Sequence, residues 1–187
     1  MKIKKILNIL FGLLIISLLV SCSIKMSEKG NIYSAVPGCK KIQMSEYKIN
    51  ILDKRQYIDD RELKIPLASL EGMMDRISPK IDIDLENLFR NILEQFRIQG
   101  DRSLMFNVEI LDIVEEFSAD RYSETEYVST KLKITVKNKL TGETITAADG
   151  EGWGSRKSTC AKAATIEKML HDSIKIAFID ALNKLNL

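Results

Sequence analysis

Residues 128–137 alternate apolar and polar side chains without a break, and this alternation is the strongest constraint on the fold. Successive side chains of a strand point to opposite faces, so a core covers one face and water covers the other. The side chains expected to face the core are Val128, Leu132, Ile134 and Val136, with Thr130 on the same face. Residues 138–142 predict a turn, and residues 143–148 predict the returning strand. The chain must therefore supply a second layer that packs on the apolar face.

Residues 85–96 supply the first element of that layer, because their apolar side chains recur at helical spacing. The stripe consists of Leu85, Leu88, Phe89, Ile92, Leu93 and Phe96. Asp82 or Asp84 can cap the first amides, and Gly100 is expected to end the helix.

The C-terminal residues predict a second helix, capped by Ser158 or Thr159. Its expected buried face is Ala163, Ile166, Leu170, Ile174, Ala177, Phe178, Ala181, Leu182 and Leu185. Two one-sided helices and a one-sided sheet can bury their apolar surfaces only against each other.

The remaining segments are assigned by alternation and by turn residues. Residues 47–51 predict a short strand, and residues 104–113 predict a longer one. The apolar phase of the longer strand slips at Leu111, which requires a bulge near Ile110. Residues 62–65 read as a strand, and residues 69–77 as one or two helical turns.

The predicted fold is a two-layer α+β sandwich with element order β-α-β-β-β-α. It has a mixed sheet of about four strands and two helices on one face. The folded domain is assigned to residues 46–187, after a tether at residues 22–45 that contains Gly30, Pro37 and Gly38.

Residues 1–21 are typical of an export signal. Three lysines precede an apolar run of about 15 residues, which is shorter than the roughly 20 needed to span a membrane. The run closes on Leu19-Val20-Ser21-Cys22, which is similar to a bacterial lipobox. Small Ser21 allows a peptidase to reach the bond before Cys22, and the Cys22 thiol can accept a diacylglycerol.

Cleavage between Ser21 and Cys22 would leave about 165 residues, enough for one domain. The lipid on Cys22, a diacylglycerol with an N-acyl chain, would anchor that domain to a membrane. Ser23 is not the Asp that favours inner-membrane retention in enteric bacteria. The sequence therefore favours the periplasmic face of the outer membrane.

Charge argues against a nucleic-acid partner. The whole chain has 28 basic and 26 acidic residues, and the signal removes three lysines and no acid. The mature chain therefore has one net negative charge and no basic cluster.

Cys39 and Cys160 remain after lipidation, in a compartment that permits disulfides. Either the two thiols form one disulfide that ties down the tether, or they stay unpaired. Unpaired thiols are favoured.

No residues predict an enzyme or a metal site. His171 is the only histidine, and it shares a polar helix face with Glu167 and Lys175. Residues 112–126 are rich in acids but lack the spacing of a calcium loop, so a solvated loop or hairpin end is expected. No cofactor other than the lipid is predicted.

Residues 150–155 have the most unusual composition, Gly-Glu-Gly-Trp-Gly-Ser, and do not match a phosphate loop. The glycines are expected to bend the chain from the last strand into the last helix. Trp153 either packs at the sheet edge as core, which is favoured, or contacts a partner protein.

The order of these segments resembles the YajG-type family of uncharacterised bacterial lipoproteins. The matching parts are residues 49–55, 85–100, 104–113, 128–137 and 150–155. The family has no established catalytic residues, so the resemblance implies none here, and its members usually lack the pair Cys39 and Cys160. More loosely, the layout is similar to auxiliary lipoproteins of lipid transport and to activators of peptidoglycan synthases.

The expected function is a non-catalytic binding, scaffolding or accessory role in the cell envelope, with an envelope protein as partner. The alternative is a lipoprotein that binds a small molecule or glycan by itself. The sequence leaves the oligomeric state open.

Overall fold

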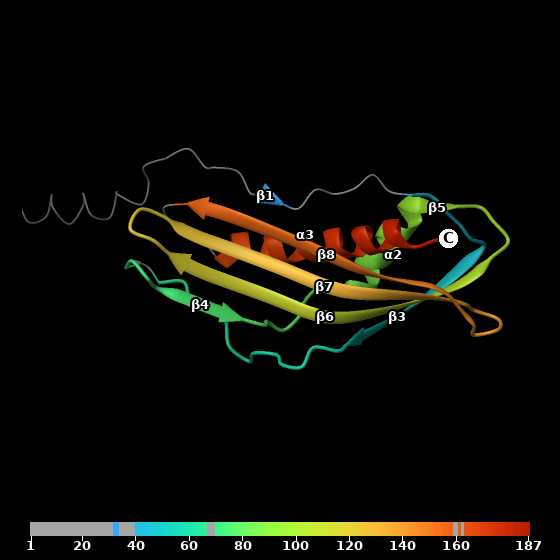
Figure 1. Ribbon diagram of the computed structural model, residues 1–187, viewed down its shortest axis with the longest axis horizontal. Helices are drawn as coiled ribbons and strands as arrows, with labels where there is room; N and C mark the ends of the chain where they lie inside the picture. The colour runs from blue at the N-terminus through green and yellow to red at the C-terminus, as the bar shows by residue number, and fades with distance from the viewer. Residues whose placement is uncertain (1–31, 34–39, 67–69, 159–160, 162) are drawn as a thin grey trace, which may run out of the picture.

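The computed structural model describes residues 32–33, 40–66, 70–158, 161 and 163–187. They form an α+β sandwich in which both helices lie behind one mixed sheet (Figure 1). The strands are β1 (Ile32–Tyr33), β2 (Ile42–Gln43), β3 (Glu46–Asp53), β4 (Met74–Ile77), β5 (Arg97–Ile98), β6 (Ser103–Ala119), β7 (Glu124–Asn138) and β8 (Thr144–Ser158). The helices are α2 (Leu85–Phe96) and α3 (Ala163–Lys184).

The main sheet has the strand order β1-β8-β7-β6-β3, so the strand–helix–strand opening places β3 and β6 side by side and parallel. All other pairings in this sheet are antiparallel. The sheet is larger than the four strands expected, because β1 and β4 each add a short edge strand. β2 and β5 form a separate parallel pair.

β6 is long enough to have two different neighbours on one side. Its first half pairs with β3 at residues 103–110, and its second half pairs with β4 at residues 115–118. The register on β7 shifts between Ile110 and Asp112, so the predicted bulge is present at Leu111. Beyond the bulge, Ile113, Glu115 and Phe117 point to the helix side.

α2 begins where the sequence predicts and ends earlier. The Asp84 side chain accepts a hydrogen bond from the backbone N of Asn87 at 3.0 Å, which caps the helix. The helix stops at Phe96 rather than at Gly100, because Arg97 takes an extended conformation and pairs with β2. Gly100 instead lies against Gln43, where an added Cβ would come within 3.0 Å of backbone atoms.

The glycine-rich run differs from its prediction. It lies inside β8, which continues to Ser158, so neither a bend at residues 150–155 nor a Ser158 cap is present. Gly150 and Gly152 face α3, and an added Cβ on either would collide with its backbone, at Ala177 and Ser173. These glycines therefore let helix and strand approach closely, as glycine does wherever backbones meet.

One hydrophobic core joins the two layers. Every described residue of the predicted α3 face is buried, and the rings of Phe89 and Phe178 stack with centroids 4.1 Å apart. Ile42 and Met44 are also in the core, at 3% and 0% exposure. Both residues lie in the segment assigned to the tether, where two isolated apolar residues show no periodicity.

The segment between β3 and α2 also departs from its prediction. Residues 62–65 are extended but pair with no strand, and Met74–Ile77 is strand β4 rather than helical turns. Pairing with β6 imposes this conformation on a segment with no clear period of its own. Among the described residues, no helix is long and apolar enough to cross a bilayer.

Candidate functional site

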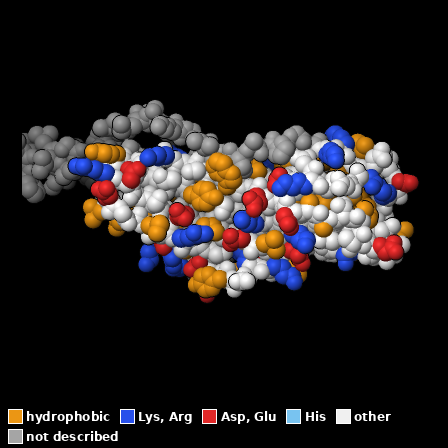
Figure 2. Space-filling view, in the orientation of Figure 1, with side chains coloured by type: hydrophobic (Ala, Val, Ile, Leu, Met, Phe, Trp, Pro, Cys, Tyr) orange, Lys and Arg blue, Asp and Glu red, His pale blue; other side chains and the backbone are white. Residues whose placement is uncertain are grey.

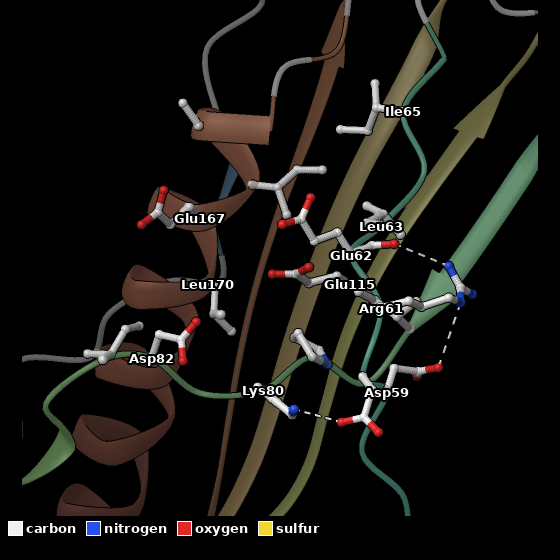
Figure 3. A pocket seen from close by; sticks show the side chains of 16 residues that line it. Asp59, Arg61, Glu62, Leu63, Ile65, Lys80, Asp82, Glu115, Glu167 and Leu170 are labelled. Atoms are coloured by element: carbon white, nitrogen blue, oxygen red, sulfur yellow. Dashed lines mark hydrogen bonds and ion pairs between the residues drawn. The ribbon is translucent and has the colours of Figure 1, made fainter.

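A groove lies on the helix side of the sheet, beside the first half of α3. α3 has 22 residues and α2 has 12, so their lengths are about 33 and 18 Å. α2 packs by β3 and the C-terminal half of α3, which leaves the strands beside β4 without a second helix. Residues 59–65, which have no regular secondary structure, cover part of the sheet face that α2 leaves open. A cavity of about 560 Å³ remains between them and α3 (Figure 3).

The wall opposite α3 is held by charged hydrogen bonds. Arg61 donates from Nη1 and Nη2 to the two carboxylate oxygens of Asp75 on β4, at 2.6 and 2.8 Å. The backbone N of Lys64 donates to Asp75 Oδ2 at 2.8 Å. The Arg61 guanidinium lowers the pKa of Asp75 to about 2. The two hydrogen bonds between Arg61 and Asp75 therefore fix the position of this segment relative to β4.

The lower end of the same wall is tied to the chain that leads into α2. Asp59 and Ser78 exchange two hydrogen bonds, at 2.7 and 2.8 Å. Lys80 Nζ lies 2.7 Å from Asp60 Oδ1. Nearby, the almost fully buried Arg55 donates to the carbonyl of Pro79 at 2.6 Å. The groove is therefore preformed on this side.

Glu115 forms part of the groove lining and is 7% exposed. It points from β6 toward α3 (Figure 3). Among the described residues it has neither a hydrogen bond nor an ion pair. Burial, with a smaller contribution from the charge of Glu167, raises the pKa of Glu115 to about 7. A largely buried carboxyl that borders a groove and has a raised pKa is a candidate functional group.

The groove combines apolar walls with an excess of acid. Its apolar side chains are Leu63, Ile65, Ile77, Pro79, Ile83, Ala164, Ile166 and Leu170. Its charged residues are six acids and two bases: Asp59, Asp60, Glu62, Asp82, Glu115, Glu167, Arg61 and Lys80. Both bases already lie beside carboxylates. Such a lining suits a ligand with an apolar body and positive charge.

Of the two alternatives for the acidic stretch at residues 112–126, a solvated loop or a hairpin end, the structure has the hairpin end. It forms the end of the β6–β7 hairpin, and Glu115, Glu124 and Glu126 are buried on the inner face. Arg156 Nη1 lies 3.6 Å from Glu126, and the backbone N of Ala161 donates to Glu124. Alternation from Ile113 onward, past the bulge, was the signal that could have identified them.

Trp153 lies on the opposite face of the sheet, which Figure 2 shows from outside. It is 38% exposed, and its cross-strand neighbour Ser129 in turn opposes Val114. Charges of both signs are interspersed over this face. The groove and Trp153 therefore belong to different faces of the sandwich.

The other predicted residues are not part of the groove. Ser21, Cys22, Cys39 and Cys160 lie outside the described residues. His171 is half-exposed on α3, with Nδ1 3.6 Å from the carboxylate of Asp172. Within the described part of the chain, no three His, Cys, Asp or Glu residues form a metal-binding group.

The described lining residues combine apolar surface with a few polar groups, which is typical of a ligand-binding site. Glu115 alone could act as an acid or a base, since its pKa is near neutral. The described lining residues include no Ser, Thr, Cys or His, and Arg61 and Lys80 lie beside carboxylates. A single proton-transfer group in an acidic, half-apolar groove fits recognition of a cation.

Comparisons with known proteins identify a weak structural neighbour. No family model and no curated protein matches the chain. The crystal structure of protein XCC0632 from Xanthomonas campestris, of the family DUF330, is similar over 79% of this chain and 82% of that one. The sequences are 10% identical and the TM-score is 0.36. This likeness is too weak to support an argument about function.

Proposed function

We propose that this chain is a lipid-anchored lipoprotein of the bacterial cell envelope, of the YajG type, and that its domain binds a ligand without catalysis. The Leu19-Val20-Ser21-Cys22 sequence supports the anchor at Cys22. Ser23, in place of the Asp that favours inner-membrane retention, supports a position on the periplasmic face of the outer membrane. The observation that carries the binding role is the preformed groove beside α3, with Glu115 buried in its lining.

The anchor is tested by fatty-acid labelling. Cells that express the full-length chain are grown with radioactive palmitate, and the protein is captured and counted beside the Cys22→Ala variant. We expect label in the wild type and none in the variant, which should also leave the membrane fraction. Label that persists after Cys22→Ala would refute the anchor.

The binding role is tested by identifying what the groove carries. The full-length lipoprotein is purified from membranes, and small molecules released from it are identified by mass spectrometry. The Ala164→Trp variant serves as the comparison, because Ala164 is exposed on α3 at the groove and an indole there would fill the space. A compound that accompanies the wild type and not the variant supports the proposal. Identical small-molecule content in the two proteins counts against it.

The outer face of the sheet supports a second candidate, an accessory subunit of an envelope assembly or transport machine. The observation is the 38% exposure of the Trp153 side chain, since tryptophan is enriched at binding hot spots. Crosslinking in intact cells, followed by capture and mass spectrometry, compares the wild type with Trp153→Ala. A discrete partner lost in the variant favours this role, and unchanged capture excludes Trp153 as its contact.

A further inference from the structure

We propose that the groove binds a small amphiphile with one primary ammonium group, which pairs with Glu115 while its apolar part lies between α3 and residues 63–65. This inference rests on the proposed binding function and names the chemical class of its ligand. Three independent features support it: the size of the cavity, the arrangement of charge along it, and the position of the Glu115 carboxylate.

The cavity has the size of a small-molecule site. Its volume of about 560 Å³ lies within the roughly 300–1,000 Å³ typical of pockets for small ligands. The apolar side chains come from both walls, with Leu63 and Ile65 on one side and Ile166 and Leu170 on the other. An apolar chain or ring between them would lose contact with water on two sides.

The charges of the groove select a cation. The two bases of the lining are neutralised, Arg61 by Asp75 at 2.6 Å and Lys80 by Asp60 at 2.7 Å. Glu62, Glu115 and Glu167 form no ion pair among the described residues. An anionic ligand would meet three carboxylates without a compensating base, whereas a cation would meet three partners.

Glu115 determines where the cation would lie. The adjacent residues on the neighbouring strands are apolar, since Ile77 of β4 and Val128 of β7 oppose it in the sheet. The charged groups around it are Glu167 on α3, residues 59–62 on the wall, and Lys80 and Asp82 on the chain entering α2. No described residue donates to the Glu115 carboxylate, which borders the groove, and an ammonium group in the groove would supply a donor.

An ammonium suits this position better than a guanidinium. Glu115 is a single carboxylate reached between apolar side chains, and the planar fork of a guanidinium needs room to align beside it. A compact ammonium can approach from any direction. Its other two protons can then be directed at Glu62 or Glu167 on either side.

The test measures binding of dansylcadaverine, an aromatic sulfonamide with a primary amine at the end of a pentyl chain. Full-length lipoprotein in phosphatidylcholine nanodiscs is titrated and fluorescence is followed, with empty nanodiscs as background. The matched probe is N-acetyl-dansylcadaverine, which has the same apolar body and no charge. We expect the wild type to bind the amine roughly tenfold to a hundredfold more tightly than the acetylated probe.

Glu115→Gln is the decisive variant and Glu116→Gln its control. Glu116 is the next residue of β6 and faces the other side of the sheet. We expect Glu115→Gln to bind both probes equally and Glu116→Gln to behave like the wild type. Glu62→Gln, at an exposed position of the groove, keeps the test decisive if Glu115→Gln does not fold. It should lower the preference for the amine by a smaller factor.

The outcomes separate the inference from the proposed function. Equal binding of both probes to the wild type, abolished by Ala164→Trp, would leave the groove as a binding site and overturn the preference for an ammonium. Retained preference in Glu115→Gln would also overturn it. If neither probe binds the wild type, the inference is overturned, while the search for co-purifying compounds still tests the binding role independently.

Discussion

Arg61 and Asp75 form a two-pronged hydrogen bond across the groove wall, with Nη1 and Nη2 2.6 and 2.8 Å from the two carboxylate oxygens. The pair joins an extended segment that has no strand partner to the edge strand β4. Asp75 also accepts from the backbone N of Lys64 at 2.8 Å. The Asp75 carboxylate thus accepts three hydrogen bonds from a segment that forms no backbone pairing with the sheet.

Asp75→Asn should loosen this wall. The amide retains one acceptor oxygen and cannot accept both prongs of the Arg61 fork, so we expect a loss of about 1–2 kcal/mol in the free energy of unfolding. Urea denaturation followed by circular dichroism measures it. Asp60→Asn is the matched control, because the Asp60 side chain is 87% exposed and water screens its pair with Lys80, so we expect a smaller loss than in Asp75→Asn. Equal losses in the two variants would contradict a special role for Asp75.

The same carboxylate should make stability sensitive to acid. The folded-state pKa of Asp75 is lowered from its ordinary 3.8 to about 2. Its contribution is therefore complete above about pH 4 and is lost as pH falls toward 2. In Asp75→Asn this contribution is absent at every pH. The difference in unfolding free energy between wild type and variant should shrink on acidification through this window, and a constant difference would refute the assignment.

Glu115 should have the opposite effect. Its folded-state pKa is raised from an ordinary 4.5 to about 7, so the folded protein retains a proton that the unfolded chain has lost. Stability therefore falls as pH rises from about 4.5 to about 7. The unfolding free energy of Glu115→Gln relative to the wild type should therefore rise across that range, measured by thermal and urea unfolding. Glu116→Gln should show no such gain, and a pH-independent effect of Glu115→Gln would contradict the prediction.

Gly152→Ala should destabilise the sandwich strongly. An added Cβ would lie 2.6 Å from the backbone N of Ala177 and collide with the carbonyl of Ser173, so α3 must move away from β8. We expect a loss of roughly 2–4 kcal/mol, seen as a lower melting temperature in calorimetry. Glu151→Ala, on the solvent face of the same strand, removes only an exposed pair with Lys131 and should cost less than about 1 kcal/mol. If Gly152→Ala were as stable as the wild type, α3 would have to lie farther from β8 than in the structure.

Thr130 and Ser173 form a buried hydrogen bond of 2.8 Å between β7 and α3. Thr130→Val keeps the shape and leaves Ser173 its bond to the carbonyl of Leu170 at 2.9 Å. We therefore expect a modest loss of about 1 kcal/mol. A double-mutant cycle with Ser173→Ala should give a coupling energy of similar size by urea denaturation, and additive losses would argue against the bond.

Periodicity in the sequence determined the secondary elements whose burial is one-sided. The stripe of α2, the alternation of β7, the bulge at Leu111 and the buried face of α3 all follow from which side chains avoid water. The α+β layers follow in turn, because these faces have no other partner. Periodicity failed for β4 and for the end of α2, where pairing with a distant strand determines the conformation. It also failed for residues 62–65, which pair with no strand and are held by the Asp75 side chain.

The groove could not be predicted in this way. The groove exists because α2 is shorter than α3 and because β6 pairs with β3 in its first half and with β4 in its second half. It also depends on the hydrogen bond by which Asp75 fixes the segment that covers the groove. Glu115 appeared polar and solvated in sequence, because acid-rich stretches usually are. The sequence by itself determined the faces of the elements, since these are local patterns, and it predicts lipidation from the lipobox-like residues 19–22. Only the tertiary structure decided which faces met and placed Glu115 in the groove, where no described residue pairs with it, because that depends on contacts between residues far apart in the chain.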